Sequence, residues 1–153
     1  MTGRPGTAVA DSFALYRIVS GHGPGAAVAR EAALGGSLRL LSPVVAVAVA
    51  AGMRDCWDEA CDERHGFLGH ELVTLCRLSG LETGLDDPGS AVEAGRLYAA
   101  STALHIDGPE VLAACHAAGP AARKGCALLT AARAAYCYRS AREAGLRLPL
   151  RAL

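Results

Sequence analysis

The chain has 153 residues, of which 52% are hydrophobic and 20% charged, so it is long and apolar enough to fold as a domain rather than stay disordered. Its 15 basic and 15 acidic side chains give a formal net charge of zero, which excludes strong overall attraction to nucleic acid or an anionic membrane. The longest apolar run, residues 43–52, is too short to span a bilayer. We expect one domain over residues 1–153 in the cytosol, with the six cysteines as thiols.

The amino-terminal third of the chain alternates short apolar runs with residues at helical spacing. The first run ends at Asp11 and Ser12, and either side chain suits the N-cap of a helix. The second run ends at Ser42 and Pro43, a strong helix start with serine as the cap and proline at the first position. These patterns predict, in order, a strand over 7–10, helices over 13–19 and 26–34, a strand over 37–41 and a helix from 43 onward.

The rest of the chain continues this alternation. Ser90 and Glu93 have the spacing of a capping box, and Thr130 is expected to cap the last helix. The predicted elements are a helical stretch over 57–78, an extended piece within 81–90, helices over 90–100 and 109–122, a strand over 126–129, a helix over 132–144 and an extended segment over 146–150. Strands that alternate with helices imply an α/β fold, with a central, mostly parallel sheet of four to five strands and helices on both faces.

Four stretches carry a resemblance to a known family. "AVADSFALYRIV" has an aspartate turn after the first strand, and "SPVVAVAVA" looks like the helix after the second. "DDPGSAVEAGRLYAAS" looks like the linker and helix after the third strand, and "CALLTAARAAY" like a strand that ends in threonine. Together they resemble the PIN domain, the fold of many small bacterial ribonucleases, including the toxins of toxin–antitoxin pairs. The resemblance implies a PIN-like fold in which carboxylates at the carboxyl ends of the central strands hold Mg²⁺ or Mn²⁺.

Few of the carboxylates that the resemblance implies are present. Asp11 matches the first, as a catalytic metal ligand that is vestigial or weak here, and it also suits a plain helix cap. The second carboxylate falls at Val47 and the fourth at Ala132, and neither aliphatic side chain binds metal. The third falls near Ala114. The pattern therefore indicates a site that has lost most of its ligands.

Other polar residues lie close to these positions in the sequence. Thr130 matches a hydroxyl that organises the turn in the family, and Ser12 and Arg133 are further candidate binding residues. Asp107 and Glu110 come about one turn before the third position and are weak substitutes for its carboxylate. Acidic residues at a helix start usually complement the helix dipole instead.

A lone aspartate is too little for a tight magnesium site, so we expect no bound cofactor and little or no nuclease activity. The leading interpretation is a degenerate PIN-like domain that acts in regulation by binding a protein partner, antitoxin-like or other, or RNA. A homodimer is compatible with it, and no membrane association is expected. The alternative is a Mg- or Mn-dependent ribonuclease of the toxin type, which would use Asp11, Glu110 or Asp107, and an acidic residue from 55–63.

The stretch from 55 to 70 supports a second alternative, a metal-binding protein that uses cysteine and histidine. Cys61 and His65 would share a helix face, and His70 follows them. Cys56 would point elsewhere on a helix, and the paired spacing of zinc sites is missing. The same stretch could instead dock a basic partner through its acidic residues, Asp55, Asp58, Glu59, Asp62 and Glu63.

The carboxyl-terminal segment is mildly basic and carries Tyr136 and Tyr138 among its arginines. Such a face could hold RNA phosphates by charge while the tyrosines stack on bases. Its basic residues, against Glu143 alone, are Arg123, Lys124, Arg133, Arg139, Arg142, Arg147 and Arg151.

Overall fold

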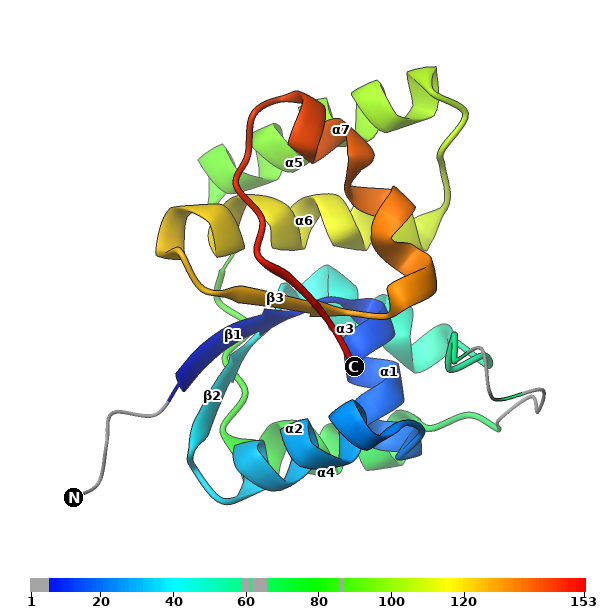
Figure 1. Ribbon diagram of the computed structural model, residues 1–153, viewed down its shortest axis with the longest axis vertical. Helices are drawn as coiled ribbons and strands as arrows, with labels where there is room; N and C mark the ends of the chain where they lie inside the picture. The colour runs from blue at the N-terminus through cyan, green and yellow to red at the C-terminus, as the bar shows by residue number, and fades with distance from the viewer. Residues whose placement is uncertain (1–5, 59–60, 62–65, 86) are drawn as a thin grey trace.

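A parallel sheet runs through the centre of the computed structural model, which describes residues 6–58, 61, 66–85 and 87–153 (Figure 1). Its four strands are β1 (Gly6–Ala10), β2 (Leu38–Leu41), β3 (Ala127–Thr130) and β4 (Leu150–Ala152), in the order β2-β1-β3-β4. All neighbouring strands pair in parallel. The predicted α/β class and the predicted parallel sheet are therefore confirmed, and the first strand of the chain lies inside the sheet.

The strands β1, β2 and β3 bury side chains in the interior, and β1 does so on both faces of the sheet. Val9 pairs with Leu41 of β2 and Leu128 of β3, and all three belong to one hydrophobic core. Ala8 and Ala10 point the opposite way and belong to a second core. This follows from the two-residue period of a strand, and burial on both sides is typical of parallel sheets.

Helices cover both faces of the sheet (Figure 1). One face carries α2 (Pro24–Leu34) and α4 (Gly69–Ser79), and the other carries α5 (Pro88–Ala103), α6 (Pro109–Lys124), the 3₁₀-helix η1 (Ala132–Tyr138) and α7 (Arg139–Glu143). Two more, α1 (Ser12–Ser20) and α3 (Val44–Gly52), follow β1 and β2 and contact helices of both layers. No helix in the described part of the chain combines the length and the apolar character that crossing a bilayer requires.

The start of α5 differs from the predicted capping box. Asp87 caps this helix, because its carboxylate accepts a hydrogen bond from the Ser90 backbone N–H at 2.7 Å and Pro88 occupies the first turn. Glu93 pairs instead with Arg123 of α6, with 2.5 Å between Oε2 and Nη1. Asp87 rather than Ser90 is the N-cap because Asp87 is followed directly by Pro88, whose fixed φ suits the first helical position.

Two other predicted caps are also wrong. Ser42 does not cap α3, whose N-cap is Pro43; its hydroxyl donates to the Ala10 carbonyl at 2.8 Å and joins the end of β2 to the end of β1. Thr130 does not cap the helix that follows β3, because Ala131 occupies that position and makes no side-chain hydrogen bond. The Ser42 hydroxyl thus serves the sheet edge rather than the helix, whereas the Thr130 hydroxyl is buried without a hydrogen-bond partner among the described residues.

The predicted helix over 132–144 consists of η1 followed by the short α7. Ala131, Ala134 and Cys137 are at most 1% exposed and lie three residues apart. A 3₁₀-helix has 3.0 residues per turn, so this spacing places all three on one buried stripe. The tighter winding also buries Tyr138 at the end of η1.

The predicted helix over 57–78 is shorter than expected, since α4 begins at Gly69 and residues 53–58 are not helical. Asp55 Oδ1 accepts a hydrogen bond from the Trp57 backbone N–H at 2.8 Å, a local bond that competes with helix formation. Trp57 itself has a positive φ of 56°. A bulky residue adopts this strained conformation only where the surrounding structure holds it in place.

The predicted extended piece within 81–90 is reduced to a single bridge. Glu82 lies beside Leu41 at the outer edge of β2, in the parallel direction. Its N–H donates to the Leu40 carbonyl at 3.2 Å, and its carbonyl accepts from the Ser42 N–H at 2.9 Å. The fifth strand is thus rudimentary, because Asp87 and the residues after it already begin α5.

Candidate functional site at the carboxyl edge of the sheet

Asp11 lies at the carboxyl edge of the sheet, where the ends of its parallel strands meet. The residue is fully buried. Oδ1 accepts a hydrogen bond from the Ala14 backbone N–H at 2.9 Å and so caps α1, while Oδ2 accepts from the Tyr138 hydroxyl at 2.5 Å. The capping role expected from the sequence is confirmed. Tyr138 lies 127 residues away, and no local pattern indicated it as a partner.

Burial controls the ionisation of this pair. Desolvation of the carboxylate raises the pKa of Asp11 to about 6, and contacts from Thr130, Tyr138 and the backbone limit the rise. The Thr130 hydroxyl lies near Asp11 and lowers the pKa of Asp11, although the two groups are not aligned for a hydrogen bond. Burial, together with the neighbouring Asp11 charge, raises the pKa of Tyr138, so its hydroxyl remains a donor.

The other three positions at which carboxylates are implied carry no metal ligand. Val47 is half-buried on α3 and packs against the second core. Ala114 on α6 is fully buried in the first core, where a carboxylate would have no water. Ala132 is exposed at the start of η1. Of these three positions, only Ala132 is exposed to solvent.

Neither weak substitute takes part in the hydrogen bonds of Asp11. Glu110 is in the first turn of α6, and Asp107 is exposed in the turn before that helix. Asp11 and Glu110 both raise the pKa of Cys137, which places them in one neighbourhood. Among the described residues, however, no three carboxylates have oxygens close enough to share one ion.

Mg²⁺ or Mn²⁺ does not fit this edge. Asp11 is fully buried and each of its oxygens already accepts one hydrogen bond, so a cation there would have to lose its water shell and find its other ligands among neighbouring side chains. The candidate binding residues Ser12 and Thr130 are buried nearby, and their hydroxyls have no hydrogen-bond partner in the described structure. Neutral hydroxyls do not replace the carboxylates that a hard, strongly hydrated cation requires.

A shallow cleft opens at the same edge, between the end of α3 and the start of α6; we call it the α3–α6 cleft. One part, of about 310 Å³, is lined by Gly52, Met53, Arg54, Asp55, Trp57 and Glu110. An adjoining part, of about 360 Å³, is lined by Ala48, Val49, Gly52, Met53, Pro109 and Glu110. The cleft thus combines an aromatic ring with charges of both signs.

Trp57 is anchored beneath this cleft by other aromatic rings. It meets Phe13 edge to face at 4.7 Å between centroids, and Tyr136 lies 6.5 Å away on its other side. Phe13 is fully buried, whereas Tyr136 is 45% exposed. Edge-to-face contact is a favoured arrangement of aromatic pairs, so the core positions the exposed aromatic surface.

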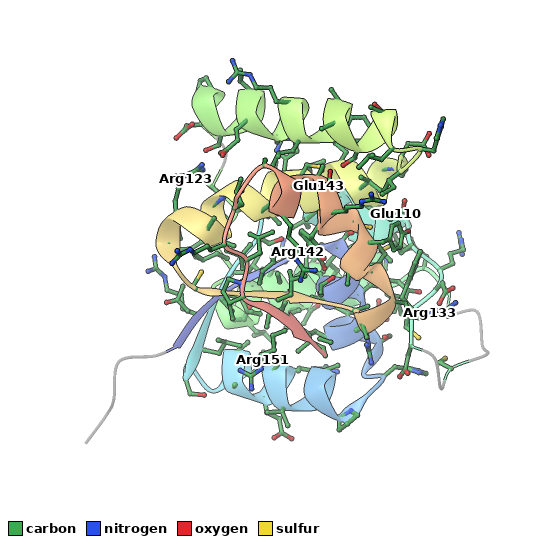
Figure 2. All side chains as sticks on the ribbon, turned by 45° about the horizontal axis from the view of Figure 1, so that its top comes forward. Glu110, Arg123, Arg133, Arg142, Glu143 and Arg151 are labelled. Atoms are coloured by element: carbon green, nitrogen blue, oxygen red, sulfur yellow. The ribbon has the colours of Figure 1, made fainter. Side chains whose placement is uncertain are left out.

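The predicted basic face is not one surface. Arg123 pairs with Glu93, and Arg139 pairs with Glu143 at 2.9 Å. Figure 2 shows Arg123 and Arg133 at opposite sides of the molecule. The expectation that both tyrosines stack on bases is wrong for Tyr138, which is fully buried. Arg133, the remaining candidate binding residue, is exposed on η1.

The acidic run is not helical in its described residues, and the docking of a basic partner there stays a prediction. Asp58 pairs with Arg17 of α1 at 3.4 Å, and both side chains are largely buried, at 17% and 7% exposed. Asp55 is tied to the Trp57 backbone. Glu59, Asp62 and Glu63 lie outside the described residues, as does His65.

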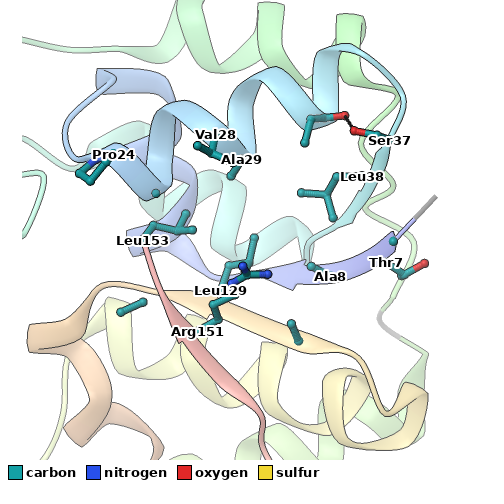
Figure 3. Close-up of a pocket in the computed structure, with 15 residues that line it drawn as sticks. Thr7, Ala8, Pro24, Val28, Ala29, Ser37, Leu38, Leu129, Arg151 and Leu153 are labelled. Atoms are coloured by element: carbon teal, nitrogen blue, oxygen red, sulfur yellow. Dashed lines mark hydrogen bonds between the residues drawn. The ribbon is translucent and has the colours of Figure 1, made fainter.

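A separate groove lies between α2 and the sheet, with a volume of about 570 Å³ (Figure 3). Thr7 and Ala8 near the start of β1, Val28 of α2, and Leu153 at the carboxyl terminus line it. It is thus on the α2 side of the sheet, and Asp11 is not among its lining residues. Of the basic segment, only Arg151 reaches it.

The sequence matches no protein-family model, and no curated protein is significantly similar to it. Its function therefore has to be argued from the arrangement of its own side chains.

Proposed function

We propose that this chain is a degenerate PIN-like domain that binds a protein partner in regulation and performs no metal-dependent chemistry. The observation that carries the proposal is the state of Asp11, whose two oxygens are buried and held by the Ala14 N–H and the Tyr138 hydroxyl. The residue that would be catalytic in a nuclease is here a structural group. We place the protein in the cytosol, since none of its six cysteines, all of them described, is in a disulfide.

The composition of the α3–α6 cleft supports a protein as the partner. Trp57 and Arg54 line the cleft, and the half-exposed Tyr136 lies beside Trp57; all three belong to the residue types enriched at the centres of protein interfaces. Asp55 and Glu110 line the same cleft and can pair with basic groups of a partner. A mixed-charge cleft of this kind suits a folded protein or peptide better than a uniformly anionic polymer.

RNA is the second candidate, favoured by one specific observation. Arg133 and Tyr136 are both exposed and lie three residues apart on η1, so a 3₁₀-helix presents them on one face. An arginine for a phosphate beside a tyrosine for a base is a minimal single-strand contact. Arg123 lies at the opposite side of the molecule (Figure 2), and Arg139 pairs with Glu143, so this RNA contact would consist of few residues.

Incubation of the protein with RNA and Mg²⁺ or Mn²⁺ should give no metal-dependent cleavage, because among the described residues no set of three carboxylates that includes Asp11 could hold one ion. The same assay on Asp11→Asn, and on wild type with a chelator, supplies the control for contaminating nucleases. Metal-dependent cleavage by the wild type that disappears in Asp11→Asn would contradict the proposal and support the ribonuclease alternative.

Affinity capture from the native cell, followed by measurement of Kd for the protein recovered, tests the binding proposal. Arg54→Glu and Tyr136→Ala should each weaken that binding by about 30-fold, the effect of losing a hot-spot side chain worth about 2 kcal/mol. Val92→Ala is the matched control, since Val92 is 56% exposed on α5, away from the cleft. Equal binding by all three variants would exclude the α3–α6 cleft as the interface.

A further inference from the structure

Three potential metal ligands meet beside α1, outside the carboxyl edge. His22 lies in the turn between α1 and α2, and Cys56 and Cys61 lie in the segment after α3. A ring nitrogen of His22 and the two Sγ atoms all lie within 4.8 Å of one another. Cys56 is fully buried, while His22 and Cys61 are partly exposed. The expectation that Cys56 and Cys61 point apart is therefore wrong, because the described residues around them, 53–58 and 61, are not helical.

The backbone on both sides brings these residues together. Gly21 and Gly23 have φ angles of 72° and 89°, so the turn around His22 uses left-handed conformations that favour glycine. A Cβ on Gly23 would lie 2.4 Å from Arg17 Nη2. The same Arg17 pairs with Asp58, which holds the segment after α3 against the end of α1.

A second local contact holds Cys61 near Cys56. The Cys61 N–H donates to the carbonyl of Asp58, the residue that pairs with Arg17, at 3.0 Å. Two thiols and one imidazole thus converge. This arrangement differs from an acidic surface cluster, since its ligands are soft and one is fully buried.

We propose that His22, Cys56 and Cys61 bind one Zn²⁺ ion, which joins the α1–α2 turn to the segment after α3. Thiolate sulfur and imidazole nitrogen are the preferred ligands of zinc. Zinc binds sulfur at about 2.3 Å and nitrogen at about 2.0 Å, so tetrahedral ligand atoms stand about 3.5–3.8 Å apart. Ligand atoms within 4.8 Å therefore need to approach by at most about 1.0–1.3 Å.

Binding would release the two thiol protons to solvent, because only thiolates ligate the metal. Burial raises the pKa of the Cys56 thiol to about 11, so the metal supplies the charge that stabilises its thiolate. Three protein ligands leave one position for water or an added ligand. Since Trp57 follows Cys56 directly, the ion would also fix one wall of the α3–α6 cleft.

Zinc titration of the reduced, metal-free full-length protein, in competition with a chromophoric chelator, tests the proposal. The wild type should bind about one Zn²⁺ per chain. His22→Gln and Cys61→Ser should each weaken binding by about a hundredfold or more, since even the loss of a residue that only orients a ligand costs about 10–100-fold. Both residues are partly exposed, so neither test depends on replacing the buried Cys56.

Cys76→Ser and Cys126→Ser are the matched controls, because both cysteines are partly buried and lie outside the cluster. They should bind zinc as the wild type does. In a second measurement, Co²⁺ should give a thiolate charge-transfer absorption that Cys61→Ser lacks. Zinc binding by His22→Gln equal to that of the wild type would overturn the proposal. So would the absence of tight binding by the reduced wild type, including a case in which the purified protein holds a Cys56–Cys61 disulfide.

Discussion

Replacing Asp11 by alanine is expected to lower the free energy of unfolding by about 2–4 kcal/mol near pH 4. The variant loses the N-cap of α1, which is worth about 0.5–2 kcal/mol, and leaves the Tyr138 hydroxyl buried without a partner, at about 1–3 kcal/mol. Urea unfolding measures the change. Tyr138→Phe and the double variant complete a cycle, in which the two changes should cost less together than their separate sum.

Tyr136→Phe is the matched control for Tyr138→Phe, since Tyr136 is 45% exposed and Tyr138 is fully buried. It should change stability by no more than about 0.5 kcal/mol. Additive losses for Asp11→Ala and Tyr138→Phe would show that the two side chains are not energetically coupled, which contradicts their structural role.

The same carboxyl group should make stability fall as the pH rises from about 4 to 6. Its pKa is about 6 in the folded state and about 3.9 in an unfolded chain, so the folded state binds more protons in this range. The contribution of Asp11 is therefore complete below pH 4 and is lost as the pH rises through about 6, by roughly 3 kcal/mol in all. Asp11→Asn should lack this decline, and a parallel pH dependence of both proteins would rule out the raised pKa.

Replacing Phe13 by alanine should lower the free energy of unfolding by about 3–5 kcal/mol. Phe13 is fully buried in the first core, and truncation of a buried phenylalanine costs this much because it removes apolar contacts and leaves a cavity. Trp57, the only tryptophan of the chain, would also lose its edge-to-face partner. Its fluorescence emission should shift toward that of a solvent-exposed indole.

The second of the two phenylalanines supplies the control for this experiment. Phe67 is 56% exposed, so Phe67→Ala should change stability by no more than about 0.5 kcal/mol and leave the Trp57 emission unchanged. Equal changes in stability and in Trp57 emission for Phe13→Ala and Phe67→Ala would contradict the role of Phe13 in positioning Trp57. The Trp57 emission thus reports on the core and on the proposed interface at once.

Local chemistry was enough to determine the fold class and the capping role of Asp11. Apolar runs that alternate with helical spacing predicted the α/β class, because burial on both faces of a parallel sheet needs such runs. Asp11 before an apolar helical pattern predicted the cap of α1, since that bond joins residues only three apart in the sequence. The cap expected at Ser42 failed because a tertiary neighbour, the Ala10 carbonyl, accepts its hydroxyl, and the cap expected at Thr130 failed because the N-cap position falls one residue later, at Ala131.

Only the tertiary structure decided what surrounds Asp11 and which cysteines meet. The bond from Tyr138 to Asp11 spans 127 residues and depends on β3 lying beside β1, which no periodicity encodes. His22 joins Cys56 and Cys61 because an Arg17–Asp58 pair and a glycine turn close a non-helical segment over α1. Sequence spacing describes neighbours along one element, whereas these sites are built between elements, where sheet order and close packing determine which side chains meet.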